Sequence, residues 1–442
     1  MRLIASDDMT PDSEKADLLK KFQAEMRRLD PVGLVGVAVS GGGDSTALLH
    51  LTKAWAAEAG GEVRAATVDH GLRLESAAEA AEVARNCAAL NLPHETLHWT
   101  GWNGRGNLQA EARAARRGLL TGWAKSHGLS AVLLGHTMDD QAETVLMRLG
   151  RGSGVDGLSG MRPASERDGV RWLRPLLGVR RAGLRDWLRA RQIAWIDDPS
   201  NDDPRFDRIK TRKALESLGD LGVSTEGLAE TASRLQDARA VLDHAAGALA
   251  AEATRWGACG EFYLSLKPFR AAPAETRRRV LRAALTRTAG AAYGPRAEAE
   301  QKLLSAILSL RLGGGRSLHG CLIRPNGVEG VVITREVAAT AGRRGDLWDG
   351  RFEVARTTPC EDGVVNALGE AGARHLSRLQ ANGAWTAPAD WSAAPRAARL
   401  TTPALFRGDA LIAAPVAGYG DALTARFAPP QPWWSEPVAA TV

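Results

Sequence analysis

The sequence predicts a doubly wound α/β domain over residues 1–215, a helical domain over 216–315 and a small, mostly β domain over 316–442. Three observations support this division. Strand-length apolar runs alternate with helical patterns through residue 196, long proline-free helical patterns follow, and short alternating runs broken by Gly, Pro and Asp complete the chain. The alternation of strand and helix indicates a parallel sheet with helices on both faces.

The elements of the first domain follow from its apolar pattern. The run at 34–39 lies between Gly33 and a glycine cluster, as is typical of a buried strand. Ligands of such a sheet bind at the carboxyl ends of its strands. The repeating pattern predicts further strands at 63–68, 94–99, 131–134 and 193–196, and helices at 11–30, 46–60, 75–90, 108–127, 139–149 and 180–192.

The later elements have weaker signals. Helical periodicity without proline predicts helices at 225–252, 274–288 and 296–311. Beyond residue 316, apolar runs of strand length alternate with turn residues. They occur at 321–325 (CLIRP), 330–335 (GVVITR), 351–356 (RFEVAR) and 409–415 (DALIAAP).

Composition narrows the classes of protein. The 442 residues are 44% hydrophobic and 24% charged, which excludes a largely disordered chain. No apolar stretch is long enough to span a membrane, and the acidic start lacks the apolar core of a secretory signal, so a cytoplasmic protein is expected. The net charge of +6 suits a polyanionic partner, although the abundance of arginine fits genome composition equally well.

The cysteines exclude several kinds of site. Cys87, Cys259, Cys321 and Cys360 are widely spaced and form no CxxC pair. This spacing excludes zinc ribbons and thioredoxin-type redox sites. We expect reduced, structural thiols.

A glycine-rich loop at 40–45 (SGGGDS) carries the strongest chemical signal. Its glycines allow a tight turn that points backbone N–H groups at a polyanion, and Ser45 stands where the next helix begins. The loop fits neither the Walker A pattern nor GxGxxG. An ordinary turn with a Ser/Asp cap is the alternative, and the strand before and the helix after the loop make it less favoured.

Two further motifs stand at predicted strand ends. The first, VDHGLR at 68–73, is where a nucleotide base would lie, or else it is a plain Asp/Gly turn. The second, GHTMDDQAET at 135–144, places Asp140 and Glu143 on one helical face. With His136 and Asp139, these carboxylates could bind Mg²⁺, hold an ammonium or accept a proton. Acids that merely complement a helix dipole are the alternative, which leaves His136 unexplained.

Three other segments carry weaker signals. The glycine-rich stretch at 150–160 predicts a mobile loop that could close over a reacting centre, or else a plain linker. Residues 171–191 carry seven arginines against one acid, which suits an RNA backbone or a solvated helix face. The acid- and proline-rich segment at 197–208 is held irregular by its turn residues.

The loop at 40–45 resembles the PP-loop of the N-type ATP pyrophosphatases, a Rossmann-like α/β fold. The motifs together resemble the tRNA(Ile)-lysidine synthases, over residues 33–215. Two positions depart from that family's pattern, which has an aromatic residue at Arg117 and an asparagine at Ile209. The segments that carry the resemblance are SGGGDS (40–45), VDHGLR (68–73), GNLQAEARAARR (106–117), LGHTMDDQAETVLMRLGRGSGVDGLSGM (134–161), RPLL (174–177) and DPSNDDPRFDR (198–208).

The resemblance implies a two-step reaction. ATP adenylates the C2 oxygen of the first anticodon cytidine in a tRNA(Ile) with a CAU anticodon, and L-lysine then displaces AMP to give lysidine. No tightly bound cofactor beyond the substrate ATP and Mg²⁺ is expected, and no membrane partner. The assembly could be a homodimer.

The resemblance also implies roles for individual residues. Asp44 would bind Mg²⁺ and Arg113 would clamp a phosphate. Asp140, Glu143 and Arg208 would hold the lysine at the reacting centre, and either a buried carboxylate or His136 would accept the proton of its amine. Pyrophosphate would be held by residues of the glycine loop, namely Ser40, Gly41, Gly42, Gly43 and Ser45. The adenine would lie near Val68, His70 and Gly71, at the end of the second strand. The tRNA phosphates would be contacted by arginines of the helical domain, namely Arg277, Arg278, Arg279 and Arg282.

Two alternatives stay open at this point. One is another PP-loop adenylating enzyme, either a tRNA thiolase or an amidating synthetase. The missing CxxC pair argues against the thiolases, and the arginine-rich stretch against the synthetases of small molecules. The other is a tRNA-binding protein that keeps a relic ATP site, against which the intact SGGGDS and DDQAET motifs argue.

Overall fold

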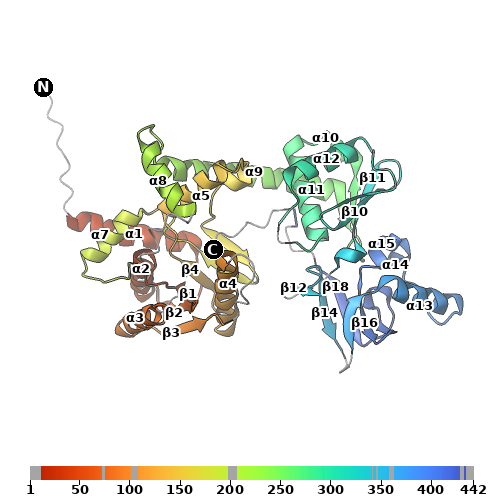
Figure 1. Ribbon diagram of the computed structural model, residues 1–442, viewed down its shortest axis with the longest axis horizontal. Helices are drawn as coiled ribbons and strands as arrows, with labels where there is room; N and C mark the ends of the chain where they lie inside the picture. Colours follow the sequence, from red (N-terminus) through yellow and green to blue (C-terminus); the bar gives the residue numbers. More distant parts are fainter. Residues whose placement is uncertain are drawn as a thin grey trace. The chain divides into compact units, whose positions relative to one another are not determined.

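The computed structural model describes residues 11–71, 75–100, 108–197, 207–291, 293–340, 342–344, 347–357, 363–428 and 433–434 (Figure 1). The chain forms two compact units. The first ends at Arg239 and the second begins at Ala240, so the division falls inside the long helix α9 (Thr225–Ala253).

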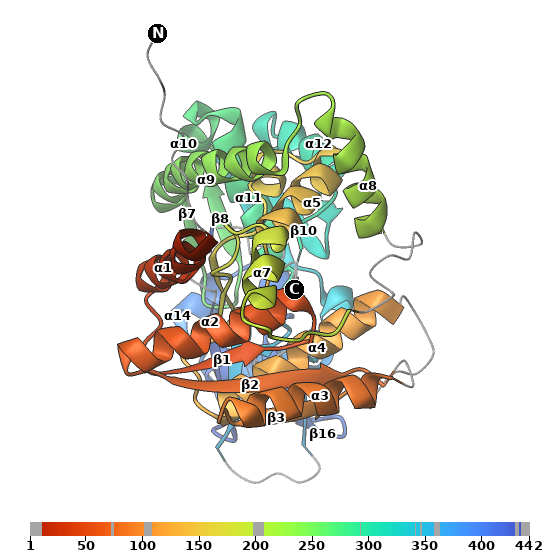
Figure 2. The ribbon, with the colours of Figure 1, turned by 90° about the vertical axis from the view of Figure 1, so that its left-hand side faces the viewer.

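A six-stranded sheet in the order β3-β2-β1-β4-β6-β5 forms the centre of the first unit. β1 pairs in parallel with both β2 and β4, as the alternating sequence predicts. Figure 2 shows β1, β2 and β3 side by side. The bounds are β1 Leu34–Ala38, β2 Glu62–Asp69, β3 His94–His98, β4 Ala131–Leu134, β5 Ala164–Arg167 and β6 Val170–Leu173.

Two features of this sheet differ from the prediction. The hairpin β5–β6 was not predicted, although its turn is the pair Asp168–Gly169, both with positive φ, which is a known hairpin signal. The expected strand at 193–196 is wrong. The hairpin already covers the β4 edge of the sheet, and the Ile196 N–H donates instead to the Gly41 carbonyl at 2.9 Å.

The predicted helices of this unit are confirmed, with some shifted ends. The helix expected at 180–192 is shorter because Ala190 caps it. The bounds are α1 Pro11–Leu29, α2 Gly43–Ala59, α3 Ser76–Ala89, α4 Leu108–Ser126, α5 Met138–Leu149, α6 Val155–Leu158, α7 Arg181–Arg189 and α8 Asp207–Gly219.

Helices cover both faces of the sheet. Val35 and Val37 of β1 pack into a core with α1, α2, α3 and α7, whereas Ala38 packs into a second core with α4. A Cβ on Gly36 would lie 2.6 Å from the ring of Trp123, so this glycine lets α4 approach the sheet. Each large side chain buried in this way stabilises the fold by roughly 1.5–3 kcal/mol. With both faces covered, the carboxyl edge of the strands is left for ligands.

The second unit contains three antiparallel sheets. A five-stranded sheet, β7-β8-β11-β10-β9, packs with the end of α9 and with α10, α11 and α12 around Phe262, Leu285 and Ile333. The Arg255 guanidinium lies over the Tyr263 ring, 3.6 Å from its centroid. The bounds are β7 Thr254–Trp256, β8 Phe262–Ser265, β9 Arg316–Leu318, β10 Cys321–Pro325, β11 Gly330–Arg335, α10 Leu266–Ala271, α11 Ala274–Thr288 and α12 Ala297–Leu308.

The other two sheets lie toward the end of the chain, in the orders β12-β13-β14-β18 and β15-β16-β17. The predicted boundary at residue 315 falls between β8 and β9, which belong to one sheet, and the three-domain division stays a prediction. The helix α13 was not predicted. The bounds are β12 Arg343–Arg344, β13 Leu347–Trp348, β14 Phe352–Arg356, β15 Val364–Ala367, β16 Pro403–Arg407, β17 Ala410–Ala413, β18 Leu423–Phe427, α13 Gly369–Ala381, α14 Ala389–Ala393 and α15 Arg396–Arg399. Over the residues described, no helix has the length and apolar character to cross a membrane.

Candidate active site

The loop that follows β1 is closed by its own hydroxyl groups. The Oγ of Ser45 accepts a hydrogen bond from the Ser40 N–H at 3.1 Å and donates to the Gly42 carbonyl at 3.0 Å. Gly41 has a φ of 86°, and a Cβ there would lie 2.6 Å from Cδ1 of Ile196. Because α2 begins within this loop, its first N–H groups, which lack helical partners, lie here. This geometry suits an anion, and pyrophosphate binding stays a prediction for Ser40, Gly41, Gly42, Gly43, Asp44 and Ser45.

The turn after β4 packs directly against this loop. A Cβ on Gly135 would lie 3.1 Å from both Cα and N of Ser45, so the absence of a side chain lets the two segments meet. Thr137 then caps α5, because its N–H and its Oγ1 each donate to Oδ2 of Asp140 at 2.8 Å. Asp140 and Glu143 are both buried and share one face of α5. The predicted nucleotide loop and the predicted lysine acids thus lie side by side.

Arg181 joins these acids, a contact that was not predicted from the sequence. Its Nε donates to Oδ2 of Asp44 at 2.9 Å and its Nη2 to Oδ1 of Asp140 at 3.1 Å. Its Nη1 lies 3.6 Å from Oε1 of Glu143. The Arg181 N–H donates to Oδ2 of Asp139 at 2.7 Å, which fixes the start of α7. The sequence offered only the clustering of arginines at 171–191 as a signal for this contact.

A second arginine reaches the same acids from α8. Nη2 of Arg212 lies 3.1 Å from Oε1 of Glu143. Arg208, which the resemblance assigned to the lysine site, begins the same helix, but its side chain lies outside the described residues. Arg212 is thus the α8 arginine seen at the acids. It stands at the second of the two arginine positions that the family pattern has after the DPSN segment.

The two acids on either side of Arg181 have pKa values shifted in opposite directions. Burial raises the pKa of the Asp44 carboxyl, and the attraction of Arg181 offsets this only in part. Burial alone would also raise the pKa of Asp140. The charges of Arg181 and His136 and the hydrogen bonds from Thr137 outweigh burial, so the pKa of Asp140 is held below its usual range. Asp140 is therefore the acid whose charged form this site stabilises.

The end of β2 carries the motif that was predicted to lie near the nucleotide base. Oδ1 of Asp69 accepts a hydrogen bond from the Gly71 N–H at 2.9 Å, which is the main cause of its lowered pKa. This turn places the His70 ring edge-on to Trp99, with centroids 5.9 Å apart. Burial, together with the charge of Arg116, lowers the pKa of His70 and favours a neutral ring. A neutral, partly buried ring suits contact with a base, as predicted for Val68, His70 and Gly71. Leu72 and Arg73 of the motif lie outside the described residues.

Arg113 and Arg116 lie on α4. Arg113 is exposed, as its predicted role at a phosphate requires. Arg116 was not singled out from the sequence. Its Nε is buried without a hydrogen-bond partner in the described part of the chain, and burial together with Arg113 lowers its pKa. Both guanidiniums are candidates for binding an anion.

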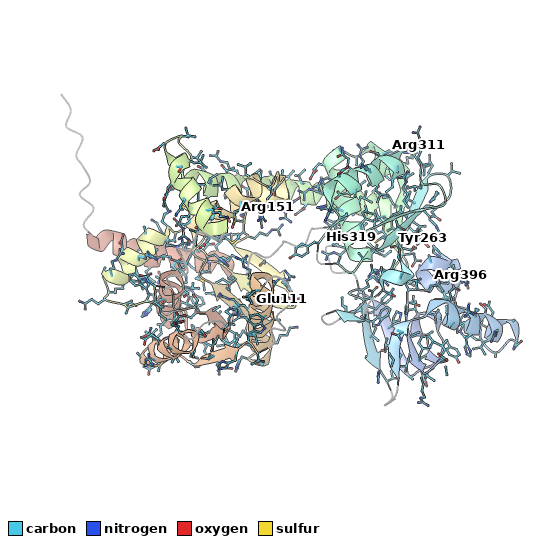
Figure 3. All side chains as sticks on the ribbon, viewed as in Figure 1. Glu111, Arg151, Tyr263, Arg311, His319 and Arg396 are labelled. Atoms are coloured by element: carbon cyan, nitrogen blue, oxygen red, sulfur yellow. The ribbon has the colours of Figure 1, made fainter. Side chains whose placement is uncertain are left out.

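The segment at 150–160, predicted to be a mobile loop, is held in place by three side chains. Gln141 of α5 forms a reciprocal pair of hydrogen bonds with the backbone of Met161. Nη1 of Arg148 donates to the carbonyls of Gly157 and Gly160. Gln236 of α9 donates to the carbonyls of Ser159 and Met161. Arg151 is exposed at the start of this segment (Figure 3).

Several arginines predicted to face RNA are used inside the protein. Arg174 is buried and donates to the Arg162 carbonyl at 3.1 Å, and Arg181 points at the acids described above. For Arg279 the prediction of a phosphate contact is wrong, because its side chain is buried and pairs with Asp243 at 2.8 Å. The other predicted arginines of α11 also have partners, namely Arg277 with the Arg270 carbonyl, Arg278 with Glu275 and Arg282 with Glu300.

The described cysteines are unsuited to sulfur chemistry. Burial raises the pKa of Cys87 to about 11 and that of Cys321 to about 12, and it raises the pKa of Cys259 as well. A reactive cysteine needs a lowered pKa and access to solvent. These three thiols are structural, and Cys360 lies outside the described residues.

Comparison with known proteins shows the family of this chain. Residues 12–218 match the PP-loop domain family. The tRNA(Ile)-lysidine synthase of Ruegeria pomeroyi is 45% identical over 416 residues, which cover 93% of this chain and 95% of that protein. The protein of the same name from Hyphomonas neptunium is 42% identical over 295 residues, which cover 65% of this chain and 78% of that protein. A solved U34-tRNA thiolase from Methanococcus maripaludis is 16% identical at a TM-score of 0.44, covering 51% of this chain and 78% of that one, and a likeness this weak says nothing about function. The chain therefore belongs to the tRNA(Ile)-lysidine synthase family.

Proposed function

We propose that this chain joins L-lysine to C2 of the first anticodon cytidine in a tRNA(Ile) with a CAU anticodon, at the expense of ATP. One observation supports this proposal above the others. A buried pair of carboxylates, Asp140 and Glu143, lies beside a glycine loop of anion-binding geometry, and Arg181 already occupies these carboxylates as a cation. A lysine ammonium carries the same charge as this guanidinium, so the same carboxylates suit it.

In the first step the C2 oxygen of cytosine attacks the α-phosphorus of ATP, and pyrophosphate leaves. The loop hydroxyls of Ser40 and Ser45 and the first N–H groups of α2 would hold that leaving group. Pre-oriented donors of this kind stabilise charge without reorganising during the reaction. The tRNA must present the base unstacked for this attack.

Mg²⁺ fits this loop through Asp44. The Oδ1 atom of Asp44 is buried and has no hydrogen-bond partner within the described ranges, while Oδ2 accepts from Arg181. Magnesium is usually bound by one or two carboxylates together with substrate phosphates, so a single orphaned carboxylate oxygen suffices. No group of three His, Cys, Asp or Glu residues able to hold a metal occurs in the part of the chain described. When bound, Mg²⁺ would neutralise charge on the pyrophosphate and offset its repulsion from Asp44.

In the second step the ε-amine of lysine attacks C2, and the oxygen departs with AMP. The amine is mostly protonated near neutral pH, because its ordinary pKa is about 10.4. Asp140 and Glu143 would hold the ammonium, and one of them or His136 would accept its proton. Arg208 remains the proposed partner of the lysine carboxylate or the AMP phosphate.

The direct test is to incubate the full chain with ATP, Mg²⁺, radiolabelled L-lysine and a CAU-anticodon tRNA(Ile) transcript. Label in tRNA(Ile), with none in elongator tRNA(Met), is expected. AMP release that depends on tRNA but leaves no label would point to a different nucleophile. Tight tRNA binding with neither label nor AMP would indicate a binding protein.

We also propose that the protein is cytoplasmic and forms a homodimer. Size-exclusion chromatography with light scattering tests the assembly.

A further inference from the structure

We infer that Arg181 couples the binding of Mg·ATP to the binding of L-lysine, as a positioning residue that releases Asp140 and Glu143 once the nucleotide is in place. The inference rests on the proposed function. It adds a role for a residue to which no step has so far been assigned.

The geometry places one guanidinium on the acids of both substrate sites. Arg181 spans from Oδ2 of Asp44, in the loop predicted to hold phosphates, to Oδ1 of Asp140 at 3.1 Å and Oε1 of Glu143 at 3.6 Å. Its side chain is only 18% exposed, so water screens these contacts weakly. Two neighbouring arginines each reach only part of this cluster. Arg212 pairs with Glu143 from α8, and Arg185 pairs with Asp197 while its charge also acts on Asp44.

Charge decides the direction of the coupling. Without ligands, Arg181 occupies the same carboxylate oxygens that a lysine ammonium needs, so the two cations compete. Bound phosphates offer the guanidinium a strong alternative acceptor, because arginine pairs bidentately with phosphate as well as with carboxylate. Mg²⁺ at Asp44 adds a further cation on that side of Arg181. Both effects weaken its hold on Asp140 and Glu143, so nucleotide should strengthen the binding of lysine.

The test compares lysine affinity with and without nucleotide. L-lysine is titrated calorimetrically into the full chain, alone and with Mg²⁺ plus an ATP analogue that has a methylene bridge between the α- and β-phosphates. For the wild-type chain we expect the analogue to lower the lysine Kd by about 5- to 150-fold, the usual range for coupled sites. Reciprocity requires that lysine strengthen the binding of the analogue by the same factor.

Four variants distinguish a role of Arg181 in coupling the two substrates from a role in stabilising the fold. In Arg181→Ala the ratio of the two Kd values should fall to within about twofold of unity, because lysine no longer competes with a bound cation. Arg181→Lys keeps the charge but loses the planar fork, so it should give an intermediate ratio even if the alanine variant folds poorly. Arg189→Ala, on the exposed side of α7, should keep the wild-type ratio. Arg212→Ala should change the lysine Kd but keep the ratio, since within the described residues Arg212 pairs with Glu143 and not with Asp44.

A wild-type ratio near unity, or a ratio that survives in Arg181→Ala, would overturn the inference while leaving the proposed function intact. If the wild-type chain binds no lysine under either condition, both the proposed function and the inference fail.

Discussion

The Arg212 guanidinium donates to one oxygen of Glu143 through two nitrogens, Nη2 at 3.1 Å and Nε at 3.2 Å. Glu143 is 2% exposed in the middle of α5, whereas Arg212 is 39% exposed on α8. The pair therefore joins the helix that begins after the acid-rich segment to the helix that carries the predicted lysine acids. The helix α8 is therefore held by the same carboxylate that the reaction is expected to use.

Replacing Arg212 by alanine should loosen α8 from α5. A hydrogen bond to a charged group contributes about 1.5–3 kcal/mol, and the exposure of Arg212 places its loss near the lower figure. Urea unfolding of the ligand-free protein measures this change. Lys213→Ala, at the adjacent exposed position, is the matched control. An equal effect of both variants would show that the pair does not stabilise the fold.

Glu143→Ala should block lysine transfer more than adenylation. Its carboxylate contacts Arg181 and Arg212, whereas Asp44 of the loop predicted to hold ATP contacts Arg181 through a different nitrogen. Single-turnover pyrophosphate release with tRNA measures the first step, and incorporation of labelled lysine measures the second. Glu111→Ala, an exposed position on α4, should leave both steps unchanged (Figure 3). Equal loss of both steps in Glu143→Ala would contradict the role.

The pH dependence of stability should change in opposite directions at Asp140 and Asp44. The lowered pKa of Asp140 adds stability above its ordinary pKa of about 3.9, and this stability is lost as the pH falls through the folded value. The raised pKa of Asp44 does the reverse, so its contribution is lost as the pH rises through the folded value.

Denaturation curves at pH 3.5 and pH 7, an interval chosen to bracket the ordinary carboxyl pKa of about 3.9, can show this difference. Relative to wild type, Asp140→Asn should lose stability at the higher pH, and Asp44→Asn should gain it. The same sign for both variants would mean that the opposed shifts are absent.

Gly135→Ala should impair nucleotide binding without a backbone conformational penalty. The added Cβ would lie 3.1 Å from backbone atoms of Ser45, which would force the glycine loop away from the turn after β4. Affinity for the methylene analogue of ATP measures the effect, and we expect a loss of at least tenfold, or about 1.4 kcal/mol. Gly118→Ala on α4 is the matched control. Its Cβ meets nothing within 4 Å, and alanine there should stabilise the helix by up to about 1 kcal/mol.

The sequence alone determined four parallel strands, β1 to β4, most of the helices around them and the position of the loops proposed to bind the substrates. These features depend on local signals, such as buried apolar runs, a glycine cluster between strand and helix, and Asp140 and Glu143 at helical spacing. Thr137 and Asp140 formed a capping box as short-range chemistry allows. The Asp168–Gly169 pair is also a local signal, because Asp-Gly favours the tight turn of a hairpin.

Only the tertiary structure decided which arginines face the site and which support the core. Arg181 and Arg174 come from one arginine-rich stretch, yet Arg181 meets three carboxylates, whereas Arg174 is buried and donates to the Arg162 carbonyl and the Ser165 hydroxyl. The partner of a long charged side chain is set by segments that fold beside it, and Asp44 is 137 positions away from Arg181 in the chain. Local sequence specifies a helix and its faces, whereas the burial and pairing of a charge depend on which other elements cover it.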